Sequence, residues 1–282
     1  MDRPTLPVLP LCSAPQAFTT IKRLAMTVES PDALLEGAVA IASHARDVTD
    51  LNRVNRLIQR YADRIRERVA GNQLQARLAH LHEFLFVERK FHGNSANYYS
   101  PLNSYLPAVI HNKCGSPIAL CLIYKTVAER LGIPCWGIGL PGHFIVGVEI
   151  DDAPMLIDPF AEGRMLVEAE AEELMHSTCG KEVKWRDEML KPVSNLHWLT
   201  RIIQNLLVGF GRAKNFSAIA AMIELEMLLW PNQVHLQRDY ALLLARIGFP
   251  QQAREWLTSY FRINPGDPEK DDLLQMLELL KP

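Results

Sequence analysis

The sequence has few cysteines and no paired spacing among them. Its 282 residues contain five, at positions 12, 114, 121, 135 and 179, and no two form a Cys-x-x-Cys unit. An odd number without paired spacing is poorly suited to a disulfide framework or a zinc ribbon. His80 and His82, two residues apart on a predicted helix, would point to different faces and make a poor metal pair. We therefore expect a reduced, cytoplasmic protein that holds no metal and no cofactor.

Long apolar runs are also missing. No stretch reaches the roughly 18 apolar residues that a membrane span requires. The chain starts with Met1-Asp2-Arg3-Pro4 and has further prolines at positions 7 and 10, unlike the uninterrupted apolar segment of a signal peptide. No membrane association is expected, and residues 1–29 are interpreted as a mobile N-terminal tail.

The chain also lacks a large excess of charge of either sign. Thirty basic and 32 acidic residues give a formal net charge of −2, which offers no electrostatic reason to expect nucleic acid or an anionic membrane as a partner. One local basic run is interrupted by two acidic residues, as on a solvated helix face; it comprises Arg60, Asp63, Arg64, Arg66, Glu67 and Arg68.

The hydrophobic residues, 48% of the chain, are enough for a sizeable core, and their spacing divides the sequence into regions. A helical period dominates residues 30–93, where Asp50 is placed to cap a helix. Residues 94–191 combine helical and strand patterns, and residues 192–282 return to a helical period. The sequence predicts an α+β domain at 94–191, flanked by an N-terminal helical segment and a C-terminal helical tail.

A candidate nucleophile precedes the apolar helix of the middle region. Cys114 lies just before Gly115-Ser116-Pro117, and proline suits the first turn of the helix that follows, because its missing N–H is no loss there. Unpaired backbone N–H groups and the positive end of the helix dipole favour a thiolate at such a position. Cys114 is therefore the predicted nucleophile.

Two later residues fit a triad with this thiol. His143 follows the turn Pro141-Gly142 and opens an apolar strand, while Asp158 ends another strand. In the first of these strands Phe144, Val146, Val148 and Ile150 alternate and are expected to face the core, leaving His143 on the other face. A cysteine at a helix start, then a histidine and an aspartate on strands, is an order that acyl-transfer chemistry can use.

Each cysteine also has a structural alternative. Because cysteine is among the most buried residue types, Cys114 taken alone fits a core position as well as a catalytic one. Its combination with His143 and Asp158 favours the triad. Cys121 and Cys135 are expected to be core thiols.

The region of residues 94–112 is loop-like and rich in tyrosine. Rigid aromatic loops beside a nucleophile often line a substrate groove, but tyrosines that pack over the edge of a core are at least as common. The sequence leaves both interpretations open.

The tail carries a spacing of its own. Trp230-Pro231-Asn232 and Asn264-Pro265-Gly266 lie 34 residues apart, which is the period of tetratricopeptide repeats. About two repeats and a final helix over 271–280 are predicted. Since at least three such units are usually needed for stability alone, we expect the tail to pack on the middle domain.

The middle region resembles the transglutaminase-like superfamily of papain-type cysteine proteins. Cys114, His143 and Asp158 fall on its cysteine, histidine and aspartate positions, and Leu131-Gly132-Ile133-Pro134 matches the phrase after its helix. From about residue 30 onward the chain is similar to bacterial SirB-type proteins, in which such a domain precedes a tetratricopeptide tail. The phrases that carry this likeness are Asn103-Ser104-Tyr105-Leu106, Pro141-Gly142-His143-Phe144 and Asp158-Pro159-Phe160.

Three hypotheses follow. The first is a cysteine hydrolase or acyltransferase in which Cys114 attacks an amide or ester, His143 transfers the proton and Asp158 orients the imidazole. The second is a non-catalytic adaptor whose helical repeats bind a protein partner. The third, a nucleic-acid regulator, rests only on the basic run at residues 60–68.

Overall fold

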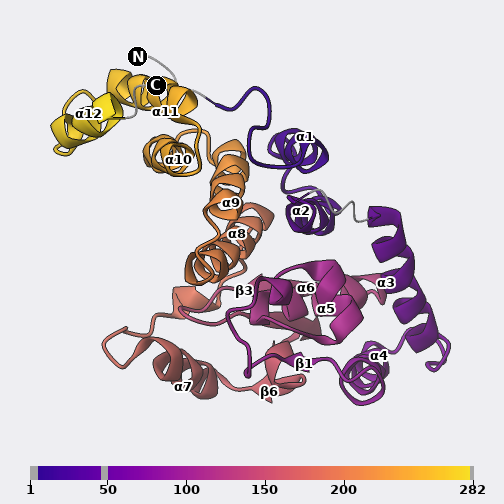
Figure 1. The fold of residues 1–282 in the computed structure, drawn as a ribbon. Helices are drawn as coiled ribbons and strands as arrows, with labels where there is room; N and C mark the ends of the chain where they lie inside the picture. The colour runs from indigo at the N-terminus through magenta and orange to yellow at the C-terminus, as the bar shows by residue number, and fades with distance from the viewer. Residues whose placement is uncertain (1–5, 46–49, 280–282) are drawn as a thin grey trace.

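A computed structural model describes residues 6–45 and 50–279 and shows a central α+β region with helices on either side (Figure 1). The N-terminal helices lie next to α8 and α9, and the C-terminal helices extend outward beyond them. No helix in the described part of the chain is long and apolar enough to cross a membrane. A single large hydrophobic cluster runs from the first helices through the central region to α8 and α9.

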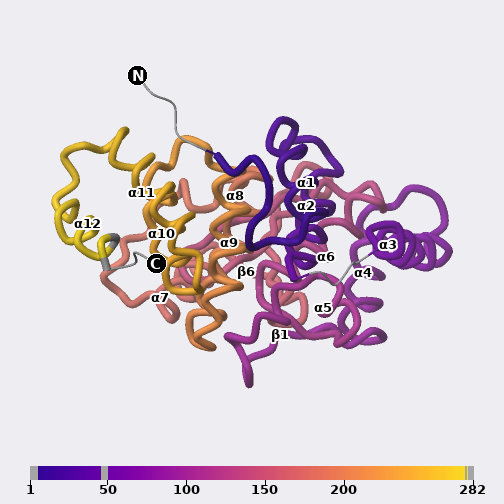
Figure 2. Tube along the Cα trace, turned by 45° about the horizontal axis from the view of Figure 1, so that its top comes forward, coloured from indigo at the N-terminus to yellow at the C-terminus, as the bar shows by residue number. Residues whose placement is uncertain are grey.

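The N-terminal segment differs from the mobile tail expected over residues 1–29. Residues Pro15–Leu24 form helix α1, whose Phe18 and Ile21 are buried. Helix α2 (Ala33–Ala42) is buried along most of its length, and α1 packs against both α2 and α9. The residues before α1 also run beside α9 (Figure 2). The expectation of a tail is therefore corrected for residues 6–29, where tertiary packing orders the chain, while residues 1–5 lie outside the described residues.

The next helices follow the predicted period. Asp50 caps α3 (Leu51–Arg66) by accepting a hydrogen bond from the Asn52 amide, which confirms the predicted start. Apolar residues of α3 such as Ile58 and Ile65 are buried at steps of three and four. Helix α4 (Leu74–His82) continues without a break into a short π-helix at Glu83–Glu88.

The central helix α6 (Pro117–Arg130) is buried nearly all round. Proline occupies its first turn, as expected from the sequence. Before it come a 3₁₀ turn (Pro101–Asn103), helix α5 (Leu106–Asn112) and a two-residue parallel ladder between β1 (His92–Gly93) and β2 (Cys114–Gly115). This ladder fixes the backbone at the entrance to α6.

A four-stranded antiparallel sheet packs against α6. Its order is β3 (Cys135–Ile138), β4 (Ile145–Ile150), β5 (Ala153–Asp158) and β6 (Arg164–Leu166). Phe144, Val146 and Val148 are buried as predicted. The opposite face of β4 is covered too, because Ile145 is buried and Gly147 lies under the ring of Trp136. The alternation expected for β4 therefore predicts fewer buried residues than the structure shows on this strand.

The rest of the chain is mainly helical. Helix α7 (Glu168–Cys179) covers one end of the sheet, and α8 (Asn195–Arg212) and α9 (Phe216–Leu229) complete the large core. Helices α10 (His235–Arg246) and α11 (Pro250–Ile263) pack on each other and on α9, and α12 (Lys270–Leu279) follows. The residues expected to form a tetratricopeptide tail are thus helical and joined to the central region through α8 and α9.

His44, at the end of α2, gives the fold a predictable dependence on pH. Burial lowers the pKa of its imidazole from 6.5 to about 4, while its Nε2 lies 2.7 Å from the hydroxyl oxygen of Tyr105. Between those two pKa values the unfolded chain binds a proton that the folded chain does not, so stability falls as pH drops from about 6.5 to 4. We expect this group to remove roughly 2 to 3 kcal/mol across that window.

The measurement is urea unfolding of the wild-type protein and His44→Gln at several pH values. Glutamine keeps a polar partner for Tyr105 but has no titrating group, so other titrations cancel in the difference. The free energy of unfolding of His44→Gln, relative to that of the wild type, should increase as pH falls. A difference that stayed constant from pH 7 to 4 would contradict the linkage.

Candidate active site

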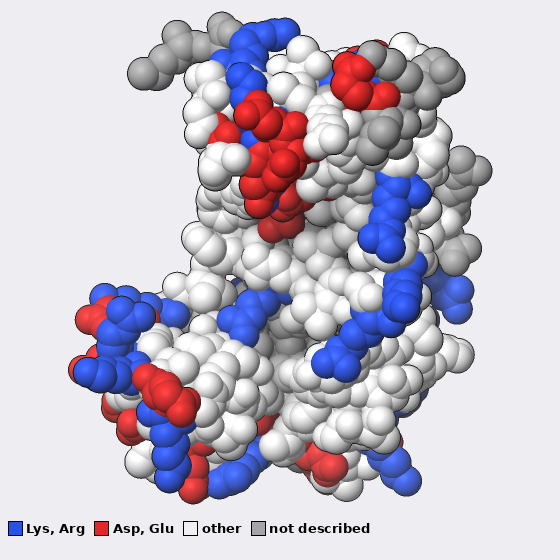
Figure 3. Space-filling model, turned by 60° about the vertical axis from the view of Figure 1, so that its left-hand side comes forward, with Lys and Arg blue, Asp and Glu red and all other residues white. Residues whose placement is uncertain are grey.

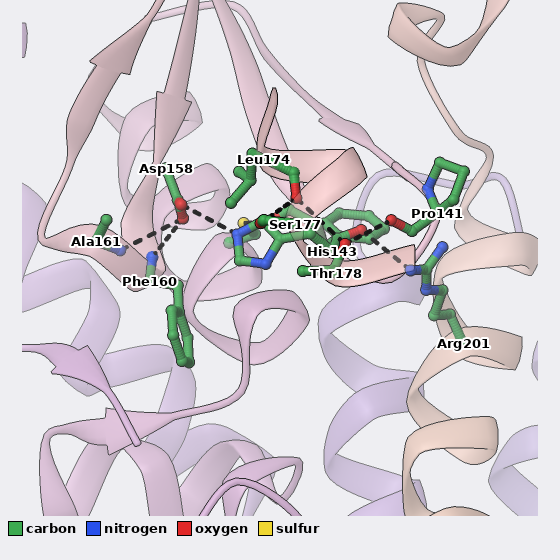
Figure 4. Close-up of polar contacts among 11 residues, drawn as sticks. Pro141, His143, Asp158, Phe160, Ala161, Leu174, Ser177, Thr178 and Arg201 are labelled. Atoms are coloured by element: carbon green, nitrogen blue, oxygen red, sulfur yellow. Dashed lines mark hydrogen bonds and ion pairs between the residues drawn. The ribbon is translucent and has the colours of Figure 1, made fainter. Parts of the chain in front are cut away.

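His143 is held at the junction between a tight turn and β4. Gly142 in that turn has a φ of +73°, and a Cβ there would lie 2.6 Å from the Thr178 hydroxyl oxygen and the Cys179 sulfur, so this position requires glycine. Arg201, from α8, donates from Nη2 to the carbonyl oxygens of Leu140, at 2.7 Å, and of His143, at 3.0 Å. The histidine backbone is therefore fixed from both sides (Figure 4).

Asp158 orients the imidazole of His143. Its Oδ2 lies 3.0 Å from His143 Nε2, and both side chains are buried. The other carboxylate oxygen accepts from the backbone N–H groups of Phe160, at 2.9 Å, and Ala161, at 3.4 Å, in the 3₁₀ turn (Pro159–Ala161) after β5. A carboxylate with these partners favours the tautomer that carries its proton on Nε2. That tautomer leaves Nδ1 with a lone pair, as a general base requires.

Cys114 is not bonded to this pair. Within the described residues no hydrogen bond or ion pair joins its sulfur to His143 or Asp158. In the β1–β2 ladder Cys114 pairs with His92, while the neighbouring Gly93 faces the ring of Phe160. Gly93 and Cys114 are not partners in this ladder, and in regular strand geometry successive residues point to opposite faces.

Phe160 stands between the ladder and the histidine. Its ring meets the imidazole of His143 edge to face, with centroids 5.7 Å apart. Gly93 is in contact with the same ring, and a Cβ on Gly93 would fall 2.5 Å from it. Among the described residues a hydrogen bond joins His143 to Asp158, and none joins Cys114 to either of them. Cys114 as their nucleophile stays a prediction.

Cys121 is the thiol that lies close to the pair. Its sulfur is 3.4 Å from the carbonyl oxygen of Phe144, and it is fully buried. Burial raises its pKa well above the ordinary value, and the charge of Asp158 raises it further. The thiol is therefore neutral and unsuited to nucleophilic attack. Cys135 is also buried, with a pKa raised by burial, so both residues are core thiols as predicted.

The other sequence candidates lie elsewhere. His82 bonds to the Tyr124 hydroxyl at 2.8 Å and His80 lies 3.0 Å from Glu83, so the two histidines have separate partners. Across the described ranges, no three histidine, cysteine or acidic side chains are grouped as metal ligands. The sequence gives no signal for the contact of Arg201 with the His143 backbone, because an arginine on an amphipathic helix is normally exposed to solvent.

Comparison with known proteins places this site in a family context. Residues 52–204 match the model described as Transglutaminase-like superfamily. A UPF0162 protein of Xylella fastidiosa is 33% identical over 242 residues, covering 84% of this chain and 86% of that protein. F-box only protein 21 of Mus musculus is 32% identical over 178 residues, covering 58% of this chain and 26% of that protein. No solved structure matches the chain significantly.

Proposed function

The chain belongs to the transglutaminase-like superfamily, and we propose that it uses this fold as a non-catalytic, protein-binding scaffold. The observation that supports the proposal is that, among the described residues, His143 is bonded to Asp158 while no hydrogen bond or ion pair joins either of them to Cys114. A thiol outside hydrogen-bond reach of the imidazole gains no help from it in losing its proton. His143 and Asp158 then serve to tie the ends of β4 and β5 together.

The helical tail is the proposed binding element, in the manner of SirB-type proteins with tetratricopeptide repeats. Helices α10, α11 and α12 pack in two smaller clusters outside the large core, the first of which they share with α9, so they extend the surface of the molecule. Figure 3 shows the side of the molecule that carries them, with acidic side chains gathered above a hollow. The proposed partner is a protein in the cytoplasm, where the five free cysteines stay reduced.

The match to F-box only protein 21 fits this proposal. The aligned residues make up 26% of that protein, so the shared region is one part of a longer chain. A region that occurs in chains of different length behaves as a module, and a fold of this kind hosts more than one function.

The second candidate is a cysteine hydrolase or acyltransferase with Cys114, His143 and Asp158 as its triad. The hydrogen bond between His143 and Asp158 favours it, because a buried imidazole of fixed tautomer is what general-base catalysis requires. In this mechanism Cys114 would attack an amide or ester carbonyl, and His143 would return the proton to the leaving group.

Labelling of Cys114 with iodoacetamide separates the two candidates. For a scaffold, the labelling rate should fall about tenfold for each pH unit below 8, as for a thiol without an activating partner. The His143→Ala variant should label at the wild-type rate within about twofold. Cys179→Ala removes the exposed thiol that would also react, and mass spectrometry confirms that the label is on Cys114.

A triad predicts the opposite results. Labelling would stay fast in mild acid, would slow in His143→Ala, and would slow less in Asp158→Asn, because the asparagine disturbs the orientation of the imidazole without removing it. That pattern, together with hydrolysis of an activated ester that stops in Cys114→Ser, would replace the scaffold proposal with the enzyme.

A further inference from the structure

A separate cavity of about 610 Å³ lies between helices α3 and α5. Val54 and Leu57 of α3 and Pro107 and Ile110 of α5 supply apolar contacts to it. Positively charged side chains come from Arg53, Arg89 and Lys113, and the lining is completed by Asp50, Tyr61 and His111. Its volume is in the range of small-molecule sites, and its mixed lining fits a ligand with one charged and one apolar part.

Two of the cations converge on a single neutral oxygen. Lys113 Nζ is 3.1 Å from the Tyr61 hydroxyl, and Arg89 Nη2 donates to the same hydroxyl at 3.2 Å. The Arg89 Nε atom is buried and has no hydrogen-bond partner. Both cations also lie over aromatic rings, Arg89 over Tyr61 at 5.1 Å and Lys113 over Phe91 at 4.8 Å. These contacts hold both charges at one wall of the cavity.

Among the described residues, no carboxylate forms an ion pair with Arg53, Arg89 or Lys113. Asp50, the carboxylate among the described lining residues, forms an ion pair with Arg56 on α3 at 3.5 Å. Glu88 precedes Arg89 in the sequence but is engaged by Arg68. Arg53 adds a third positive charge to the lining. Like charges gathered without a carboxylate between them repel each other, and a bound anion removes that repulsion.

The backbone at Lys113 supports the same interpretation. This residue ends α5 in the left-handed conformation, with φ of 62°, which is uncommon for a residue other than glycine or asparagine. The conformation turns the lysine side chain back toward Tyr61 and the carbonyl oxygen of Ile110. Backbone strain that places a charge in a cavity is typical of binding sites.

From these contacts we propose that the cavity binds a phosphate monoester. The guanidinium fork of Arg89 and the point charge of Lys113 suit the oxygens of a phosphoryl group, and the Tyr61 hydroxyl can donate to one of them. The ester substituent lies against Val54 and Leu57. The site is independent of His143 and of the fate of Cys114 as a nucleophile.

The test is isothermal titration of the full chain with phenyl phosphate at low salt. One saturable site is expected, and phenol, which lacks the charge, should not bind. Lys113→Asn should weaken binding at least tenfold, since asparagine tolerates the left-handed backbone but removes the cation. Arg53→Gln changes an exposed side chain and should weaken binding about threefold without affecting folding.

Arg60→Gln is the matched control, because Arg60 is exposed on the same helix and is not part of the cavity. Its affinity should stay within twofold of wild type. Lack of saturable binding by millimolar phenyl phosphate would overturn the proposal, and so would an equal loss in Arg60→Gln and Lys113→Asn. Tighter binding of a single-stranded oligonucleotide that Arg60→Gln also weakens would assign the charges to a nucleic-acid surface instead.

Discussion

Replacing Glu224 with alanine is expected to lower the free energy of unfolding by about 4 kcal/mol. Glu224, in α9, is fully buried and accepts hydrogen bonds from the N–H groups of Leu11, at 2.7 Å, and Ser13, at 2.8 Å. The Ser13 hydroxyl at 2.5 Å and the Tyr240 hydroxyl at 2.6 Å also donate to it. Alanine would leave these donors without an acceptor in the protein. Each donor would then have given up its hydrogen bond to water on folding without gaining another.

Urea unfolding of the wild type and the variant measures this loss. Glu255→Ala, at an exposed position of α11, controls for removal of a carboxylate and should change stability by less than about 0.5 kcal/mol. Limited proteolysis adds a local measurement: in Glu224→Ala, cleavage before α1 should become much faster than cleavage in the core. A loss below about 1 kcal/mol would mean that water replaces the carboxylate.

Replacing Trp198 with alanine should also cost about 4 kcal/mol. Trp198 lies on α8 and is fully buried, with its ring centroid 4.6 Å from that of Phe144. It fills the space above Gly137, where a Cβ would fall 2.2 Å from the indole. Its Nε1 makes no hydrogen bond in the described structure, so the expected loss comes from packing alone.

The same variant tests whether α8 and the sheet unfold together. We expect a single unfolding transition whose midpoint lies at a lower urea concentration than in the wild type, because the indole joins the two parts of one core. Trp185→Ala removes a half-buried indole outside the large cluster and should cost about 1 kcal/mol. Two separate transitions in Trp198→Ala would show that the tail folds on its own, contrary to the expectation from its repeat number.

Features that depend on local chemistry were predictable from the sequence. Proline at the start of α6, the Asp50 cap and the burial of Cys121 follow from residue type and spacing, and the structure confirms them. The meeting of His143 and Asp158 was also predictable, since each lies at the end of a strand of one sheet.

Features that depend on distant residues were not predictable. Cys114 pairs with His92 in a two-residue ladder, and the neighbouring Gly93 lies against the ring of Phe160, which is distant in sequence. Burial of α1 was not predictable because one of the two helices that cover it, α9, is far away in sequence. Glutamate is normally exposed, so the sequence predicts a surface position for Glu224. Only its contacts with a segment more than 200 residues earlier explain its burial.

The contact between residues 11–13 and Glu224 also sets an order of events during synthesis. Its partners are separated by as many as 213 residues, so the N-terminal segment leaves the ribosome long before α9 exists. At 5–20 residues per second, that delay is on the order of 10 to 40 seconds. Until then α1 has α2 as a neighbour but lacks α9, and the backbone donors before it are bonded to water. Closure of this contact is therefore a late step, and a ribosome-bound chain truncated before α9 should remain open to protease at its N-terminal end.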